Sequence, residues 1–149
     1  MSENTLHIYT DGACEGNPGP GAWSSVMLFN GSRKEMTGYA PYTTNNKMEL
    51  SAPLAALRSL KETSRPYSIN VYSDSQYLIK GMNEWLAKWK KNGWRSKSGQ
   101  VKNKELWEAL DKMNRIHEIK WIWVKGHASS EHNNRCDFLA KEQIRINRG

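Results

Sequence analysis

The sequence predicts a single α/β domain built on a five-stranded mixed sheet, with three antiparallel plus two parallel strands, flanked by helices. The first observation is Asn30-Gly31, a favoured two-residue turn that lies between two strand-like runs. The second is a helical pattern between strand-like runs at 5–10 and 68–73, which indicates a crossover joining parallel strands. The third is another strand-like run at 119–124 that follows two more helical segments. A chain of 149 residues is long enough to bury the core of one such domain.

The N-terminal part of the chain is predicted to form three strands. The first covers 5–10, and Asp11 follows at its expected exit, before a loop rich in glycine and proline. The second and third, at 22–29 and 34–39, pair through the Asn30-Gly31 turn. Asp11-Gly12 read alone is equally well explained as an ordinary turn.

A helix is predicted to begin within 43–50, where a threonine supplies the N-cap. Four leucines then follow at helical spacing, namely Leu50, Leu54, Leu57 and Leu60. Pro53 lies inside this helix and cannot donate to the Glu49 carbonyl, so we expect a local distortion there. The strand at 68–73 ends at a second carboxylate, Asp74.

The C-terminal half is predicted to contain helices at 75–91 and 103–114, the strand at 119–124, and a last helix at 131–146. The last helix carries Asp137. We assign three tryptophans of this half, Trp107, Trp121 and Trp123, to the core or its edge.

The composition is that of an ordinary soluble protein with a basic balance. The chain has 22 lysines and arginines against 15 acidic residues, a net charge of +7 that favours a polyanionic partner. The N-terminus has no secretory leader pattern, and no apolar run approaches a membrane span. We therefore expect a cytoplasmic monomer, in which Cys14 and Cys136 are more often reduced than paired.

Four carboxylates are candidates for chemistry: Asp11, Glu49, Asp74 and Asp137. Each alone has an ordinary explanation as a turn, cap or surface residue, but Asp11 and Asp74 follow strands that should run side by side. Clustered carboxylates repel one another and raise each other's pKa, so a cation is expected to compensate them. Oxygen ligands without histidine or cysteine at zinc spacing favour Mg²⁺ or Mn²⁺, and two such ions support phosphoryl transfer.

The segment from Trp85 to Lys104 contains seven lysines and arginines and no acidic residue. Trp85, Trp89 and Trp94 are interleaved with these charges, a pattern typical of a surface that holds a nucleic-acid backbone. A solvated charged face is the ordinary alternative, and Trp85 and Trp89 could also pack on each other.

Six blocks of the sequence resemble bacterial type 1 ribonuclease H, in the order found in that family. They are 10–21, 43–50, 74–77, 89–94, 123–128, and Asn133 with 135–137. The resemblance implies an enzyme that hydrolyses the RNA strand of RNA–DNA hybrids and leaves 5′-phosphate and 3′-hydroxyl ends. It also implies that Asp11, Glu49, Asp74 and Asp137 bind two Mg²⁺, with Mn²⁺ as a substitute, and that Asp11 bridges both ions. His127 would be a proton shuttle or product-release aid.

The resemblance further assigns substrate-binding roles. Short amides beside the metal ligands are expected to read 2′-hydroxyl groups in a wide minor groove: Asn17, Asn45, Asn46 and Gln76. Thr44 and Asn103 match a pocket for a phosphate of the DNA strand. A basic protrusion at about 82–104 would grip that strand through Trp85, Lys90, Lys91, Trp94 and Arg95. The chain departs from the family pattern at Tyr42, where an arginine often stands, and at Asn134, where an acidic residue often stands.

Two other functions are compatible with these features. One is a nuclease of the same fold that acts on DNA, which a cleavage comparison on hybrid, duplex RNA and duplex DNA would identify. The other is a non-catalytic nucleic-acid-binding module, which would bind without any metal-dependent cleavage.

Overall fold

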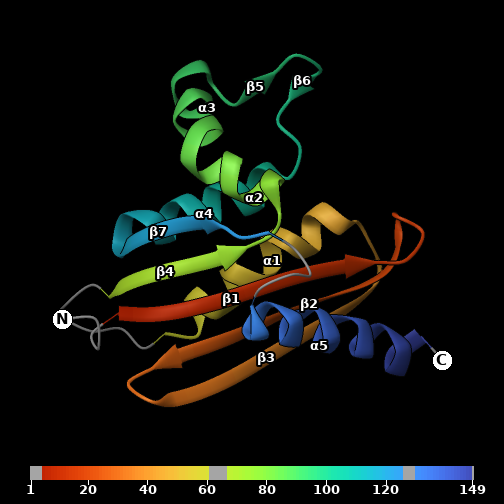
Figure 1. Ribbon diagram of the computed structural model, residues 1–149. Helices are drawn as coiled ribbons and strands as arrows, with labels where there is room; N and C mark the ends of the chain where they lie inside the picture. The colour runs from red at the N-terminus through yellow and green to blue at the C-terminus, as the bar shows by residue number, and fades with distance from the viewer. Residues whose placement is uncertain (1–4, 61–66, 126–129, 149) are drawn as a thin grey trace.

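The computed structural model describes residues 5–60, 67–125 and 130–148. Its main sheet has five strands in the order β3-β2-β1-β4-β7, and Figure 1 shows them side by side. The strands are β1 Thr5–Cys14, β2 Gly19–Phe29, β3 Ser32–Thr43, β4 Ser68–Ser73 and β7 Glu118–Trp123. β1, β2 and β3 pair antiparallel, whereas β4 runs parallel to both β1 and β7. The predicted fold class is confirmed.

The hairpin between β2 and β3 forms at Asn30-Gly31, as predicted. Asn30 has φ 49° and Gly31 has φ 81°, the left-handed conformations that the favoured two-residue turn requires. The prediction that β1 ends at Thr10 was wrong. β1 continues through Asp11 to Cys14 because each of these residues pairs with β2, up to Cys14 opposite Gly21. The parallel pairing with β4 reaches only Tyr9, so Asp11 lies just beyond it.

Helix α1, Asn45–Arg58, begins where the sequence predicts. The Thr44 hydroxyl caps it by accepting a hydrogen bond from the backbone N–H of Lys47 at 3.2 Å. α1 continues through Pro53 to Arg58.

The predicted helix at 75–91 consists of three pieces. They are α2 Gln76–Lys80, the π-helical turn η2 Gly81–Trp85, and α3 Leu86–Asn92. Gly81 stands at the start of the π turn, where an added Cβ would lie 2.0 Å from the Trp107 ring. The chain then forms a small hairpin that sequence reasoning missed, with β5 Arg95–Ser96 and β6 Gly99–Gln100. α3 and this hairpin project away from the main sheet in Figure 1.

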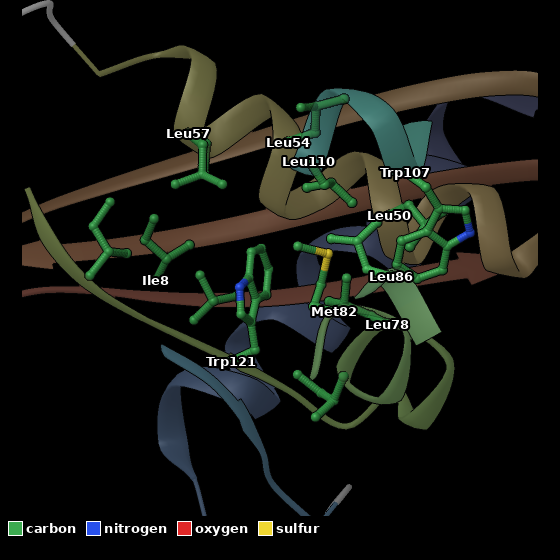
Figure 2. Packing of buried hydrophobic residues seen from close by; sticks show 14 of the residues in the cluster. Ile8, Leu50, Leu54, Leu57, Leu78, Met82, Leu86, Trp107, Leu110 and Trp121 are labelled. Atoms are coloured by element: carbon green, nitrogen blue, oxygen red, sulfur yellow. The ribbon is translucent and has the colours of Figure 1, made fainter. Parts of the chain in front are cut away.

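The main core lies between one face of the sheet and the helices α1 and α4 Lys104–Ile116. Figure 2 shows Ile8 of β1 and Trp121 of β7 below the leucines of α1, with Trp107 of α4 close by. The last helix, α5 Glu131–Arg148, packs on β1, β2 and β3 through the buried side chains of Cys136, Ala140 and Ile144. Trp107 and Trp121 are buried as predicted. Trp123 at the end of β7 is 46% exposed and does not pack against the core cluster, so its assignment to the core or its edge was wrong. None of the described helices is both long and apolar enough to cross a membrane.

Candidate metal centre and nucleic-acid interface

Three carboxylates from separate elements meet at one edge of the sheet. Among the described residues, Asp11, Glu49 and Asp74 each offer an oxygen that lies within 4.8 Å of the other two. Asp11 and Asp74 meet because each stands just beyond the parallel pairing of β1 with β4. Glu49 joins them because Gly12 lets the backbones of β1 and α1 approach closely. A Cβ at Gly12 would lie 2.5 Å from the Glu49 nitrogen.

Burial makes two of the three carboxylates, Asp11 and Glu49, costly to ionise. Asp11 is 8% exposed and Glu49 is 6% exposed. Burial, followed by the charges of Asp74 and Asp137, raises the pKa of Asp11 to about 8. Burial, followed by the charges of Asp11 and Asp74, raises the pKa of Glu49 well above its usual value. A divalent cation at this position would favour the ionised form of each group.

The donor atoms fit such a cation. The Glu49 Oε1 atom is buried and has no hydrogen-bond partner among the described residues. A buried oxygen of this kind costs free energy unless something binds it. Carboxylate oxygens are the ligands that Mg²⁺ and Mn²⁺ prefer, whereas zinc sites in proteins usually include histidine nitrogen or cysteine sulfur.

Asp137 lines the same cavity from α5. This cavity has a volume of about 290 Å³, and Asn133, Asn134 and Lys141 also line it. The Asp137 carboxylate pairs with the Lys141 ammonium at 3.1 Å and also raises the pKa of Asp11. Sequence reasoning did not assign roles to Asn133 and Lys141, although Lys141 follows Asp137 at the i,i+4 spacing that brings two side chains together. The predicted site residue His127 lies outside the described residues.

A second cavity separates the start of α1 from the projecting hairpin. Its volume is about 670 Å³, and the predicted phosphate-binding pair Thr44 and Asn103 both line it. Asn103 donates a hydrogen bond from Nδ2 to the Tyr77 hydroxyl at 3.1 Å. Tyr42 is 75% exposed and is not part of this lining.

The predicted amides lie between and around the two cavities. Asn45 lines the carboxylate cavity, while Asn17 and Asn46 line the second one. The Asn17 Oδ1 atom accepts a hydrogen bond from the Asn45 backbone N–H at 2.8 Å, which ties the loop after β1 to the start of α1. Gln76 is exposed at the start of α2 and lines neither cavity.

The tryptophans of the protrusion pack on one another and on the core. The ring centroids of Trp85 and Trp89, and those of Trp89 and Trp94, are 5.9 Å apart. Trp89 also meets buried Trp107 edge-on at 5.3 Å. The alternative that Trp85 and Trp89 pack together is confirmed, and each of the three protrusion tryptophans keeps part of its surface exposed.

The cations of the protrusion are not equivalent. The Lys90 ammonium pairs at 3.1 Å with Asp111 of α4, whose side chain is only 10% exposed. Lys91 and Arg95 are exposed and have no ion-pair partner within the described parts of the chain. The structure therefore places Lys90 as an anchor of α3 on α4 and leaves Lys91 and Arg95 available to a ligand.

Comparisons with known proteins identify relatives of this chain. The sequence model of the RNase H family matches residues 3–145. The ribonuclease H of Acetivibrio thermocellus is 51% identical over 144 residues, which cover 95% of this chain and 96% of that protein. The ribonuclease H of Legionella pneumophila is 52% identical over 136 residues, covering 91% of this chain and 93% of that protein.

Solved structures have the same fold. LC9-RNase H1, described as a type 1 RNase H with the type 2 active-site motif, aligns with a TM-score of 0.84 and 28% identity, over 96% of this chain and 73% of that one. LC11-RNase H1 in complex with RNA/DNA hybrid aligns with a TM-score of 0.73 over 97% of this chain and 99% of that one. At 24% identity, the comparison with LC11-RNase H1 shows a shared fold alone.

Proposed function

Since this chain belongs to the ribonuclease H family, we propose that it is a metal-dependent endoribonuclease that hydrolyses the RNA strand of RNA–DNA hybrids. The observation that carries the proposal is the meeting of Asp11, Glu49 and Asp74, with a buried Glu49 oxygen that lacks a hydrogen-bond partner among the described residues. A relative of the same fold was solved with RNA/DNA hybrid, which supports the choice of substrate.

In this proposal Asp11, Glu49 and Asp74 hold divalent cations, and Asp137 contributes from α5. Bound there, two such ions would activate the attacking water and offset the charge that develops on the leaving oxygen. Water attacks the phosphorus and gives up one proton to a nearby base or to solvent, the bond from phosphorus to the 3′ oxygen breaks, and that oxygen takes up a proton. The products are then a 3′-hydroxyl end and a 5′-phosphate end. His127 is proposed to carry a proton to or from the site.

Selection of a hybrid needs one strand to be recognised by its 2′-hydroxyl groups. We propose that Asn17, Asn45, Asn46 and Gln76 donate or accept hydrogen bonds with those groups. Asn45 and Asn46 are adjacent in sequence but line different cavities, one at the carboxylates and one at Thr44 and Asn103. This arrangement suits a duplex whose RNA strand lies at the first cavity and whose DNA strand lies at the second.

The protrusion at about 82–104 is proposed to bind the DNA backbone, mainly through Lys91 and Arg95. The exposed surfaces of Trp85 and Trp94 would support the same strand. Lys90 would contribute indirectly, by holding α3 against α4, because its ammonium is paired with Asp111. We further propose that the chain works as one catalytic domain, as a monomer in the cytoplasm, with no obligate protein partner.

The proposal can be tested with three duplexes of one sequence: an RNA–DNA hybrid, duplex RNA and duplex DNA. Each is incubated with and without Mg²⁺ or Mn²⁺, and the ends of the products are identified. We expect metal-dependent cleavage of the hybrid alone, within the RNA strand, with 5′-phosphate ends. Cleavage of duplex DNA would favour another nuclease of the same fold, and binding without cleavage would favour a non-catalytic module.

A further inference from the structure

A positively charged lysine lies on the α5 side of the carboxylate cavity. Lys141 places its ammonium 3.1 Å from Asp137 Oδ2, at i,i+4 spacing on α5. Within the lining formed by the described residues, Lys141 is the only lysine or arginine of this cavity. The neighbouring position on the same rim is Asn134, which is neutral. The single negative charge of Asp137 is thus matched by a single positive charge.

The two sides of the cavity therefore differ in charge. Asp11, Glu49 and Asp74 bring their oxygens together within 4.8 Å, and Asp137 is outside that group of three, although its carboxylate interacts with Asp11. A cation that uses Asp11, Glu49 and Asp74 gains three carboxylates. A cation that uses Asp137 must share it with an ammonium or displace the ammonium, which lowers its affinity because like charges repel.

We infer that Lys141 is a resident counter-ion of Asp137, and that it keeps the α5 side of the metal centre weakly occupied until substrate is bound. This inference rests on the proposed function. The Lys141 side chain is 63% exposed, so it can leave Asp137 without disturbing the core. A phosphate of the RNA strand would supply both an oxygen ligand for the incoming cation and a new partner for the released ammonium. Metal occupancy and substrate binding would then be thermodynamically coupled.

The test compares Lys141→Met with a matched control, Arg145→Met. Both substitutions remove one positive charge from an exposed position of α5, but Arg145 pairs with Glu142 and does not line the cavity. Binding of Mn²⁺ is measured by calorimetry without any nucleic acid. We expect Lys141→Met to tighten the weaker of the two Mn²⁺-binding events by about three- to tenfold. Arg145→Met and the charge-conserving Lys141→Arg should both behave like the wild type.

Two further measurements separate this role from a merely structural one. The gain should disappear when Lys141→Met is combined with Asp137→Asn, since the ammonium acts through that carboxylate. In hybrid cleavage, Lys141→Met should lower the Mg²⁺ concentration needed for half-maximal rate and raise KM for the hybrid.

An unchanged Mn²⁺ isotherm for Lys141→Met, or an equal gain for Arg145→Met, would overturn the inference. If the wild-type protein still binds Mn²⁺ and cleaves the hybrid in that case, the proposed function stands. Wild-type protein that neither binds Mn²⁺ nor cleaves hybrid would instead refute the proposed function together with this inference.

Discussion

Replacing Asp11 with asparagine should stabilise the metal-free protein, and the gain should grow with pH. The pKa of Asp11 is raised to about 8 in the folded protein, against an ordinary value of 3.8. An acid with a raised folded-state pKa binds its proton more tightly when folded, so the free energy of unfolding falls as pH rises between those two values. The asparagine side chain has no charge to bury, so Asp11→Asn should not show this loss.

The structure gives the size of the effect. A carboxylate pair separated by 4.8 Å, the limit found for these oxygens, repels by about 3 kcal/mol at an effective dielectric constant of about 20. The rise in the pKa of Asp11 from 3.8 to about 8 corresponds to about 6 kcal/mol as an upper bound. The asparagine amide is still a buried polar group, so we expect the advantage of the variant to increase by about 2–4 kcal/mol from about pH 5 to about pH 9.

The assay is urea unfolding of both proteins in the presence of a chelator, followed by circular dichroism. Asp111→Asn is the matched control, because Asp111 is also buried but pairs with Lys90 and Arg115. That control should lose stability near neutral pH. Saturating Mg²⁺ should shrink the advantage of Asp11→Asn by stabilising the wild type. A pH-independent difference, or a less stable Asp11→Asn at about pH 9, would refute the reasoning.

Four further outcomes are expected. Changing Lys91 and Arg95 to Ala should raise KM for the hybrid and flatten its salt dependence, and a fall in kcat at constant KM would contradict this binding role. Lys90→Ala should instead lower the free energy of unfolding by about 1 kcal/mol, because it breaks an ion pair to α4, and an unchanged urea midpoint would argue against that anchor. Tyr42→Arg should tighten hybrid binding at low salt by about 1 kcal/mol through a charge-assisted contact with a DNA phosphate, so an unchanged KM would place position 42 away from the backbone. His127→Ala should slow turnover roughly ten- to a hundredfold, and an unaltered rate would remove His127 from the mechanism.

The sequence contains enough information to bring Asp11 and Asp74 together. Strand-like runs on either side of a helical crossover predict parallel neighbours, and residues that follow such strands meet at one edge. The approach of Glu49 to these two carboxylates cannot be predicted from the sequence in the same way. It depends on the contact between Gly12 and the backbone of α1, which only the packed structure shows.

Other features depend on contacts between distant residues. β1 extends past Asp11 because β2 provides partners as far as Cys14, and local pattern favoured a turn there instead. Lys90 appeared to be one of several equivalent cations, but the docking of α3 on α4 pairs it with Asp111, 21 residues away. Trp123 is exposed at the end of β7, where its indole N–H donates to the Asp74 carbonyl at 3.3 Å. Its residue type alone favoured the core or its edge.

The most direct test of the central claim, that these carboxylates form a catalytic metal centre, is the rate of hybrid cleavage by the wild type and Asp11→Asn as Mg²⁺ is added. The wild-type rate should rise from near zero and saturate. Asp11→Asn should remain folded and should be slower by on the order of a thousandfold or more at every Mg²⁺ concentration. Substantial Mg²⁺-dependent cleavage by folded Asp11→Asn would contradict the assignment of Asp11 to that centre.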